Sequence, residues 1–285
     1  MRTLAQIKAT LEAIGAEPKR ALGQNFLIDH NLIRKLIESA GPADGRLAFE
    51  VGPGAAALTE PLLDAGWKLV ACELDDALCD WLTDEFASQI GSGQLTIVRG
   101  DCLESKHEVS VDAVRALGGG PFTHIANLPY SAATPLIMTL LVEHPECESL
   151  HVTIQREVAD RLAAAPGSKA YGEISIVAQA LASVKLVSKV PASCFWPAPK
   201  VESAMIAITR RDDPLTDDPR GLVGFTHRVF ARRRKQLGSI LKEPVQAGLV
   251  WPEGIQPLDR PEKLSPAQIV ALWRAVEQVE PRATT

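Results

Sequence analysis

Short apolar runs alternate with helical patterns over the first 210 residues of the chain. The runs are rich in Val, Ile and Leu with little polar alternation, which is typical of strands in a parallel sheet that is covered on both faces. They lie at residues 47–51, 68–74, 95–99, 122–127 and 151–155, with two further strands expected at 184–190 and 201–209. Apolar positions with helical spacing lie at residues 31–40, 56–65, 76–88, 134–143 and 172–183. This alternation predicts a doubly wound α/β domain.

The pattern changes after residue 210. Residues 211–220 are polar, contain two prolines and lack any periodicity, so they indicate a domain boundary. Beyond them the pattern is wholly helical, with Leu222, Phe225 and Val229 at helical spacing and Ser265-Pro266 as the start signal of a last helix. We therefore expect a first, larger domain over residues 1–212 and a small helical domain over residues 213–285.

Composition indicates a protein that has no membrane-spanning segment, no structural metal site and no disulfide bonds. The 285 residues are 46% hydrophobic, enough for one large and one small core, and no run approaches 18 apolar residues. The five cysteines are odd in number and lack metal-ligand spacing, so reduced thiols and no metal site are expected. These features predict a cytoplasmic protein that has no membrane partner.

Charge is distributed unevenly along the chain. Residues 42–130 carry 14 acidic against 5 basic side chains, whereas residues 216–285 carry 11 basic against 8 acidic. Because phosphate binding depends on local patches, the second segment is a candidate phosphate-binding surface, with a solvated helix face as the alternative. Four consecutive bases cannot share one helix face, so at least one should pack or pair with an acid. The candidates are Arg228, Arg232, Arg233, Arg234, Lys235 and Lys242.

The tetrad Asn127-Leu128-Pro129-Tyr130 directly follows the predicted strand at residues 122–127. Asn127 has a carboxamide oxygen that accepts hydrogen bonds, and Pro129 biases Leu128 toward an extended conformation, which can leave the Leu128 carbonyl without a backbone partner. Tyr130 adds a flat aromatic face. Two acceptors beside an aromatic ring indicate a pocket for a planar base that bears an amino group.

A glycine-rich turn follows the first predicted strand, at Gly52 and Gly54. Such a turn lets the backbone approach a ligand, but the third glycine of the dinucleotide fingerprint is absent, which weakens a nicotinamide interpretation. Glu73 ends the second strand, where it can accept from ribose hydroxyls, and Asp101 follows the third, where it can accept from an adenine amine. Their neighbours Leu74 and Cys102 are further candidates for binding the same ligand. Taken alone, the turn could be a simple strand-to-helix connection.

The acidic residues near this turn bear on the choice of cofactor. Glu50, Glu73 and Asp101 would attract a cofactor whose reactive centre is a sulfonium cation and would repel a nucleotide diphosphate. Charge and the missing glycine therefore favour S-adenosyl-L-methionine over NAD, and a nicotinamide oxidoreductase is the weakest interpretation.

An ordered set of motifs from about Lys19 to about Leu272 resembles the small-subunit ribosomal RNA adenine-N6,N6-dimethyltransferases. The resemblance implies a Rossmann-like class I S-adenosylmethionine-dependent methyltransferase domain, of the α/β class, with a small all-helical C-terminal RNA-binding domain. It also implies a monomer that modifies two adjacent adenines, each dimethylated, in small-subunit ribosomal RNA or an assembling small subunit. The motifs are Leu22-Gly-Gln-Asn-Phe-Leu27, Glu50-Val-Gly-Pro-Gly54, Glu73-Leu-Asp75, Asn127-Leu-Pro-Tyr130, Gln155-Arg-Glu-Val158, Lys169-Ala-Tyr-Gly172, Phe195-Trp-Pro-Ala-Pro-Lys-Val201, Phe230-Ala-Arg-Arg-Arg-Lys235 and Arg260-Pro-Glu-Lys-Leu-Ser265.

The resemblance also implies a role for each matching residue. Asn127 and the Leu128 carbonyl would hold the target amine, while Tyr130 and Phe195 would stack on the two faces of the base. The cofactor would be held at its methionine end by Gln24, Asn25 and Leu27, through the backbone by Gly52 and Gly54, at its ribose by Glu73 and at its adenine by Asp101. This chain departs from the family pattern at Gly238 and at Ser131-Ala132.

Other functions remain open from the sequence. A binding protein could keep the fold without turnover, for instance as a ribosome-assembly factor. Enzymes that confer antibiotic resistance by modifying large-subunit RNA share the tetrad. A DNA or protein-glutamine methyltransferase could use the tetrad as well, but the basic cluster and the segment from Gln24 to Leu27 argue against it.

Overall fold

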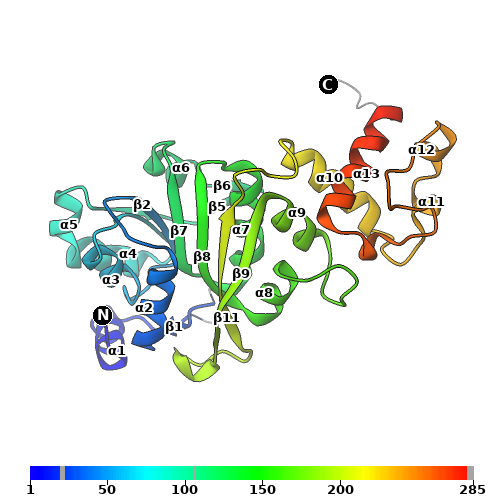
Figure 1. The fold of residues 1–285 in the computed structure, drawn as a ribbon. Helices are drawn as coiled ribbons and strands as arrows, with labels where there is room; N and C mark the ends of the chain where they lie inside the picture. The colour runs from blue at the N-terminus through cyan, green and yellow to red at the C-terminus, as the bar shows by residue number, and fades with distance from the viewer. Residues whose placement is uncertain (20–22, 106, 281–285) are drawn as a thin grey trace. The chain divides into compact units, whose positions relative to one another are not determined.

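The structure is a computed structural model and describes residues 1–19, 23–105 and 107–280; Leu22 of the first motif lies outside these residues. It contains a mixed seven-stranded sheet (Figure 1). The five strands from β4 to β8 in sheet order run parallel, and β11 runs antiparallel to β8. In sheet order the strands are β4 (Leu95–Arg99), β3 (Lys68–Glu73), β2 (Leu47–Val51), β7 (Phe122–Asn127), β8 (Cys147–Gln155), β11 (Ser203–Arg210) and β9 (Ala182–Val190). The predicted α/β class and all seven expected strands are confirmed.

Consecutive residues of the central strands are buried, as in Leu150–Ile154 of β8. Because neighbouring strand residues point to opposite faces, helices or loops must cover both faces of this sheet. This explains why the strands carry continuous apolar runs in place of an alternating pattern. Two short antiparallel ladders lie outside the sheet, one between β1 (Phe26–Leu27) and β10 (Phe195–Trp196), the other between β5 (Leu103–Ser105) and β6 (Glu108–Val109).

The helices begin at recognisable caps. Asp29 and Asp75 cap α2 and α4 by accepting backbone N–H groups, and Ser265 forms a capping box with Gln268 at α13. The helices are α1 (Leu4–Ala13), α2 (His30–Ser39), α3 (Thr59–Asp64), α4 (Asp76–Glu85), α5 (Ala87–Gly91), α6 (Val111–Leu117), α7 (Tyr130–Glu143), α8 (Arg156–Leu162), α9 (Glu173–Leu181), α10 (Pro219–Phe230), α11 (Leu237–Ile240), α12 (Lys242–Gln246) and α13 (Pro266–Val279), with 3-10 turns η2 (Ala192–Cys194) and η3 (Pro261–Lys263).

Three predicted helices differ from the structure. The helix expected from residue 134 begins already at Tyr130. The helix expected from residue 56 begins only at Thr59, because Gly54 and Ala56 have positive φ angles that a right-handed helix cannot contain. The pattern at residues 76–88 is interrupted at Phe86, which ends α4 and precedes α5. Within the described residues, every helix is too short or too polar to cross a lipid bilayer.

The chain divides into two compact units. The first comprises residues 1–159 and 185–209, and the second comprises residues 160–184 and the described residues from 210 on. The second unit thus contains α9 besides the C-terminal helices. One reason lies in Tyr171, which is fully buried, packs edge-on against Phe230 and donates its hydroxyl to the Leu264 carbonyl at 2.8 Å. Helix α8 and strand β9 each have residues in both units.

Gly238, one of the departures from the family pattern, has a packing reason within the second unit. Its N–H donates to the Pro257 carbonyl at 2.9 Å, and a Cβ at this position would lie 3.2 Å from Pro257 Cβ. Since few real Cβ contacts are this short, a larger residue would push the 257 loop away.

Candidate functional site

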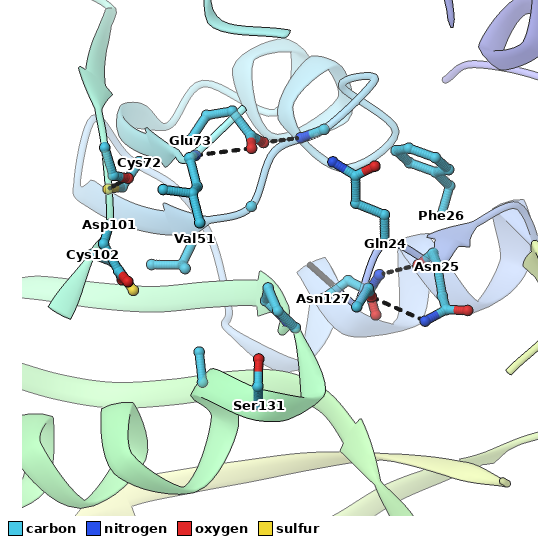
Figure 2. Close-up of a pocket in the computed structure, with 17 residues that line it drawn as sticks. Gln24, Asn25, Phe26, Val51, Cys72, Glu73, Asp101, Cys102, Asn127 and Ser131 are labelled. Carbon is cyan, nitrogen blue, oxygen red and sulfur yellow. Dashed lines mark hydrogen bonds between the residues drawn. The ribbon is translucent and has the colours of Figure 1, made fainter. Parts of the chain in front are cut away.

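Four residues that the sequence placed at strand ends lie around one cavity of about 260 Å³ (Figure 2). Gly52, Glu73, Asp101 and Asn127 follow or end the parallel strands β2, β3, β4 and β7, whose carboxyl ends meet at one edge of the sheet. The cavity lies close to the lower limit of small-molecule sites, roughly 300–1,000 Å³. Its lining is Gly23, Gln24, Asn25, Phe26, Val51, Gly52, Gly54, Cys72, Glu73, Leu74, Gly100, Asp101, Cys102, Asn127, Pro129, Ser131 and Ala132.

The glycine turn forms one wall with its backbone. Gly54 has a φ of +55°, and a Cβ at this position would lie 2.7 Å from the Phe26 ring. Gly52 has a φ of +72°, and its Cβ would lie 3.4 Å from Pro129. Backbone conformation and close contact therefore both require glycine at position 54, and the wall stays free of side chains on this side.

Glu73 is held in place by three backbone N–H groups. One carboxylate oxygen accepts from Leu74 and Asp75, and the other accepts from Gly54, each at 2.9 Å. Burial raises the pKa of the Glu73 carboxyl, and these three hydrogen bonds oppose the rise. An ionised carboxylate has about four acceptor sites, so about one remains for a ligand hydroxyl. This is fewer than the two ribose hydroxyls expected from the sequence.

Asn127 has a defined amide orientation. Its Nδ2 donates to the Asn25 carbonyl at 2.8 Å, and the Asn25 side chain donates in turn to the Gly23 carbonyl at 2.9 Å (Figure 2). With Nδ2 occupied, Oδ1 is the atom that can accept a hydrogen bond from an incoming amine. The Leu128 N–H donates to the Thr153 carbonyl at 3.1 Å, and no described residue donates to the Leu128 carbonyl. Two acceptors of the expected kind therefore lie on adjacent residues.

Five of the predicted site residues do not line the cavity: Leu27, Glu50, Leu128, Tyr130 and Phe195. Leu27 and Phe195 face each other in the β1–β10 ladder, and both are buried. Tyr130 is half-buried at the start of α7, where its hydroxyl lies 2.7 Å from Ser203 Oγ. Their roles in base binding remain predictions.

Glu50 differs from the expectation of a charged pocket residue. It is almost fully buried and accepts from the Thr59 hydroxyl at 2.8 Å. Burial raises the pKa of the Glu50 carboxyl to about 8; the Thr59 hydrogen bond opposes this rise and the Glu73 charge adds to it. At neutral pH the group is thus mostly protonated, and the argument that Glu50 adds negative charge to the pocket is corrected. A sequence does not reveal this, because the cause is burial.

Replacing Glu50 by glutamine is expected to make stability less dependent on pH between 4.5 and about 8. In this window the folded protein keeps a proton that the unfolded chain has released. The contribution of the group to stability is therefore fully present below pH 4.5 and is lost as the pH rises toward 8. Glutamine cannot ionise and can still accept from Thr59. Thermal unfolding at pH 5 to 8 measures the effect; parallel Tm curves for the two proteins would contradict it.

The basic cluster splits into paired and unpaired side chains. Arg228 lies 2.7 Å from Glu280, and Arg233 lies 3.1 Å from Glu262. The remaining four are exposed and have no acidic partner among the described residues: Arg232, Arg234, Lys235 and Lys242. Residues 231–235 form turns after α10. The expectation that at least one base pairs with an acid is confirmed.

The cavity also contains residues that the sequence analysis did not assign to the site, among them Phe26, Val51 and Ser131. Val51 and Phe26 are adjacent to predicted site residues, which is the signal that could have identified them. Ser203, the partner of Tyr130, carries no local signal because it lies 73 residues away along the chain. In the part of the chain that the structure describes, no group of three or more His, Cys, Asp or Glu is placed to hold a metal ion.

Known proteins resemble this chain over most of its length. The sequence matches the family described as ribosomal RNA adenine dimethylase over residues 15–278. A protein of Sphingopyxis alaskensis, ribosomal RNA small subunit methyltransferase A, is 38% identical over 275 residues, which cover 95% of this chain and 98% of that protein. A protein of the same name from Shouchella clausii is 38% identical over 286 residues, which cover 96% and 95%.

Solved structures show the same fold. A dimethyladenosine transferase from Plasmodium falciparum has a TM-score of 0.71 at 20% identity, covering 90% of this chain and 98% of that chain. The 23S rRNA methyltransferase ErmE has a TM-score of 0.66 at 23% identity, covering 89% and 100%. The predicted class I methyltransferase fold is thereby confirmed. Because the family match spans nearly the whole chain and agrees with these full-length relatives, the chain belongs to the ribosomal RNA adenine dimethylase family.

Proposed function

We propose that this protein transfers methyl groups from S-adenosyl-L-methionine to the N6 amine of adenines in small-subunit ribosomal RNA, dimethylating each of two adjacent adenines. The observation that carries the proposal is the orientation of Asn127, whose Nδ2 is held by the Asn25 carbonyl so that Oδ1 can accept from an amine. The choice of small-subunit RNA as the substrate rests on the relatives from Sphingopyxis and Shouchella, which are both described as ribosomal RNA small subunit methyltransferase A. In this proposal the protein is a cytoplasmic monomer, and its substrate is free RNA or an assembling small subunit.

The lining of the cavity supports the proposed cofactor. The glycine turn leaves a side-chain-free wall at which a ligand can approach the backbone, and a Cβ at Gly54 would disturb this wall. Asp101 accepts the Leu103 N–H with Oδ1 at 3.0 Å, which leaves Oδ2 for an adenine amine. When bound, S-adenosyl-L-methionine supplies a methyl group on a positively charged sulfur. In the proposal its contacts are Gln24 and Asn25 at the methionine end, Gly52 and Gly54 along the backbone, Glu73 and Leu74 at the ribose, and Asp101 and Cys102 at the adenine.

The proposed chemistry depends on shaping the amine, not on deprotonating it first. The lone pair of an adenine amine is delocalised into the ring, so the nitrogen is a poor nucleophile. Asn127 Oδ1 and the Leu128 carbonyl can accept its two hydrogens, which favours a pyramidal nitrogen and stabilises the positive charge that develops there. The released proton can pass to water. No strong base is needed in this scheme.

The aromatic residues complete the proposal for the base. Tyr130 would stack on one face of the adenine, and its hydroxyl contact with Ser203 limits rotation of the side chain. Phe195 and Leu27 are buried side by side in the β1–β10 ladder, so a role for either in contacting ligand requires the ladder to shift on binding. A target adenine must leave its stack, which single-stranded loops allow at small cost.

The unpaired bases of the second unit are the proposed phosphate contacts. Replacing Arg232, Arg234 and Lys235 together by alanine is expected to weaken RNA binding and to lower the salt dependence of log K by about 2, because each lost phosphate contact lowers the slope by about 0.7–0.9. Arg233→Ala is the matched control: it breaks the contact with Glu262 and should lower Tm with little change in slope. Filter binding between about 50 and 300 mM salt measures the affinity and its salt slope, and thermal unfolding measures Tm. An unchanged slope in the triple variant would remove these bases from the RNA surface.

Labelled methyl transfer tests the proposed function. The protein is incubated with methyl-labelled S-adenosyl-L-methionine and, in separate reactions, with immature small subunits, large subunits and protein-free RNA that lack the modification. Digestion to nucleosides and mapping identify N6-methylated adenines and count the methyl groups. We expect N6,N6-dimethyladenine at two adjacent positions of small-subunit RNA.

Other outcomes would support the alternatives. Label confined to large-subunit RNA would replace the substrate by that of the antibiotic-resistance type of enzyme. No label in any RNA, with S-adenosylhomocysteine still bound in calorimetry, would favour an RNA-binding or ribosome-assembly factor that does not turn over. Monomethyladenine alone would correct the number of methyl groups and leave the reaction class standing.

A further inference from the structure

Phe26 lies between the glycine turn and a tryptophan from a distant part of the chain. Its ring stacks on Trp196 with centroids 6.2 Å apart and an angle of 21° between the planes. On the cavity side, the same ring would be 2.7 Å from a Cβ at Gly54, so ring and glycine backbone are in close contact. Phe26 is nearly buried and lines the cavity (Figure 2). Its position is therefore set by Trp196 and in turn limits the position of the glycine turn.

The backbone around this stack ties the two segments together. Phe26 pairs with Trp196 in the β1–β10 ladder, and the Ile28 N–H donates to the Cys194 carbonyl at 2.9 Å. Trp196 also contacts the Lys8 ammonium of α1, which lies 5.1 Å from the ring centroid. Ladders of two residues are weak alone, so side-chain contacts must contribute to their stability. The stack of Phe26 on Trp196 is such a side-chain contact within the ladder.

The segment held by this ladder also orients the proposed catalytic amide. Asn25 directly precedes Phe26, and its carbonyl accepts from Asn127 Nδ2 at 2.8 Å. Gln24 and Asn25 both line the cavity. A displacement of Phe26 would therefore move the cavity wall and the acceptor that orients Asn127 together.

We propose that Trp196 is a positioning residue, which holds residues 24–26 against the glycine turn and thereby preorganises both the cofactor cavity and the Asn127 amide. Trp196 itself does not line the cavity, so it acts through Phe26. The inference rests on the proposed function, because it assigns the cavity to the cofactor.

The test replaces Trp196 by leucine, which removes the stack, and by phenylalanine, which can keep it. An aromatic pair contributes about 0.5–1.5 kcal/mol, so loss of the stack should weaken S-adenosylhomocysteine binding about twofold to tenfold. The phenylalanine variant should bind within about twofold of wild type. At saturating cofactor the leucine variant should still show a lower kcat for RNA methylation, because the Asn127 amide is less well held. Calorimetry measures the binding and single-turnover methylation measures the rate.

Trp81 provides a matched control within the same unit. It is partly buried like Trp196, packs on Phe86 with centroids 6.4 Å apart and has the Arg2 guanidinium 4.8 Å from its ring, and neither Phe86 nor Arg2 lines the cavity. Trp81→Leu should lower Tm about as much as Trp196→Leu while leaving S-adenosylhomocysteine binding unchanged. A general loss of stability would weaken binding in both variants.

Each outcome decides the inference. It is overturned if Trp196→Leu binds S-adenosylhomocysteine and methylates RNA like wild type, or if Trp81→Leu loses binding to the same degree. It is also overturned if phenylalanine restores Tm but not binding. If the wild-type protein does not bind S-adenosylhomocysteine, the proposed function is wrong about the cofactor. If the wild-type protein binds it and Trp196→Leu binds it equally well, only the inference about Trp196 is wrong.

Discussion

Asn127→Ala is expected to lower kcat for RNA methylation by about a hundredfold or more, because loss of one preorganised hydrogen-bonding group usually has an effect of this size. The acceptor removed is Oδ1, which the hydrogen bond from Nδ2 to the Asn25 carbonyl orients. The glycine turn, Glu73 and Asp101 are not altered, so S-adenosylhomocysteine should bind within about twofold of wild type. Single-turnover methylation and calorimetry on the purified variant measure the two quantities.

Asn127→Asp is the control for amide orientation. The carboxylate keeps an acceptor oxygen but cannot donate to the Asn25 carbonyl, so it would be repelled from this partner. We expect a rate closer to that of alanine than to wild type. Wild-type turnover in Asn127→Ala, or loss of cofactor binding together with activity, would show that Asn127 is not the group that holds the amine.

Glu73→Ala is expected to abolish measurable S-adenosylhomocysteine binding and to lower the free energy of unfolding by about 1–3 kcal/mol. The carboxylate accepts from the N–H groups of Gly54, Leu74 and Asp75, and alanine leaves these three donors without a protein partner. Water that enters from the adjoining cavity can satisfy part of them, which limits the loss of stability. Urea denaturation and calorimetry separate the effect on folding from the effect on binding.

Glutamine at position 73 is the matched control. Its amide oxygen can accept from Leu74 and Asp75, but its NH₂ group would then face the Gly54 N–H, which is also a donor. The glycine turn should therefore be displaced while the backbone at Leu74 and Asp75 stays in place, with an intermediate loss of stability. A stable Glu73→Ala variant that binds S-adenosylhomocysteine normally would remove Glu73 from the cofactor site.

All seven strands could be located, and three of them to the residue, because continuous apolar runs mark strands that are buried on both faces; the prediction at 151–155 misses the first four residues of β8. Residues 47–51, 95–99 and 122–127 agree with β2, β4 and β7 at both ends. The two-residue strands β1 and β10 could not be predicted, because nothing local in Phe26–Leu27 shows that it pairs with Phe195–Trp196. Helix α3 begins late for a reason that only backbone geometry shows, the positive φ of Gly54 and Ala56.

By itself, the sequence determined the α/β alternation and the placement of chemical groups at strand ends, because both follow from local periodicity and from the rule that parallel strands end at one edge. Only the tertiary structure decided which atoms are free to react. The Asn127 amide is oriented by a carbonyl 102 residues away, and Arg233 is neutralised by a glutamate 29 residues away. Glu50 keeps its proton because it is buried. Partners, burial and charge state depend on segments that meet only when the chain folds, so no local pattern encodes them.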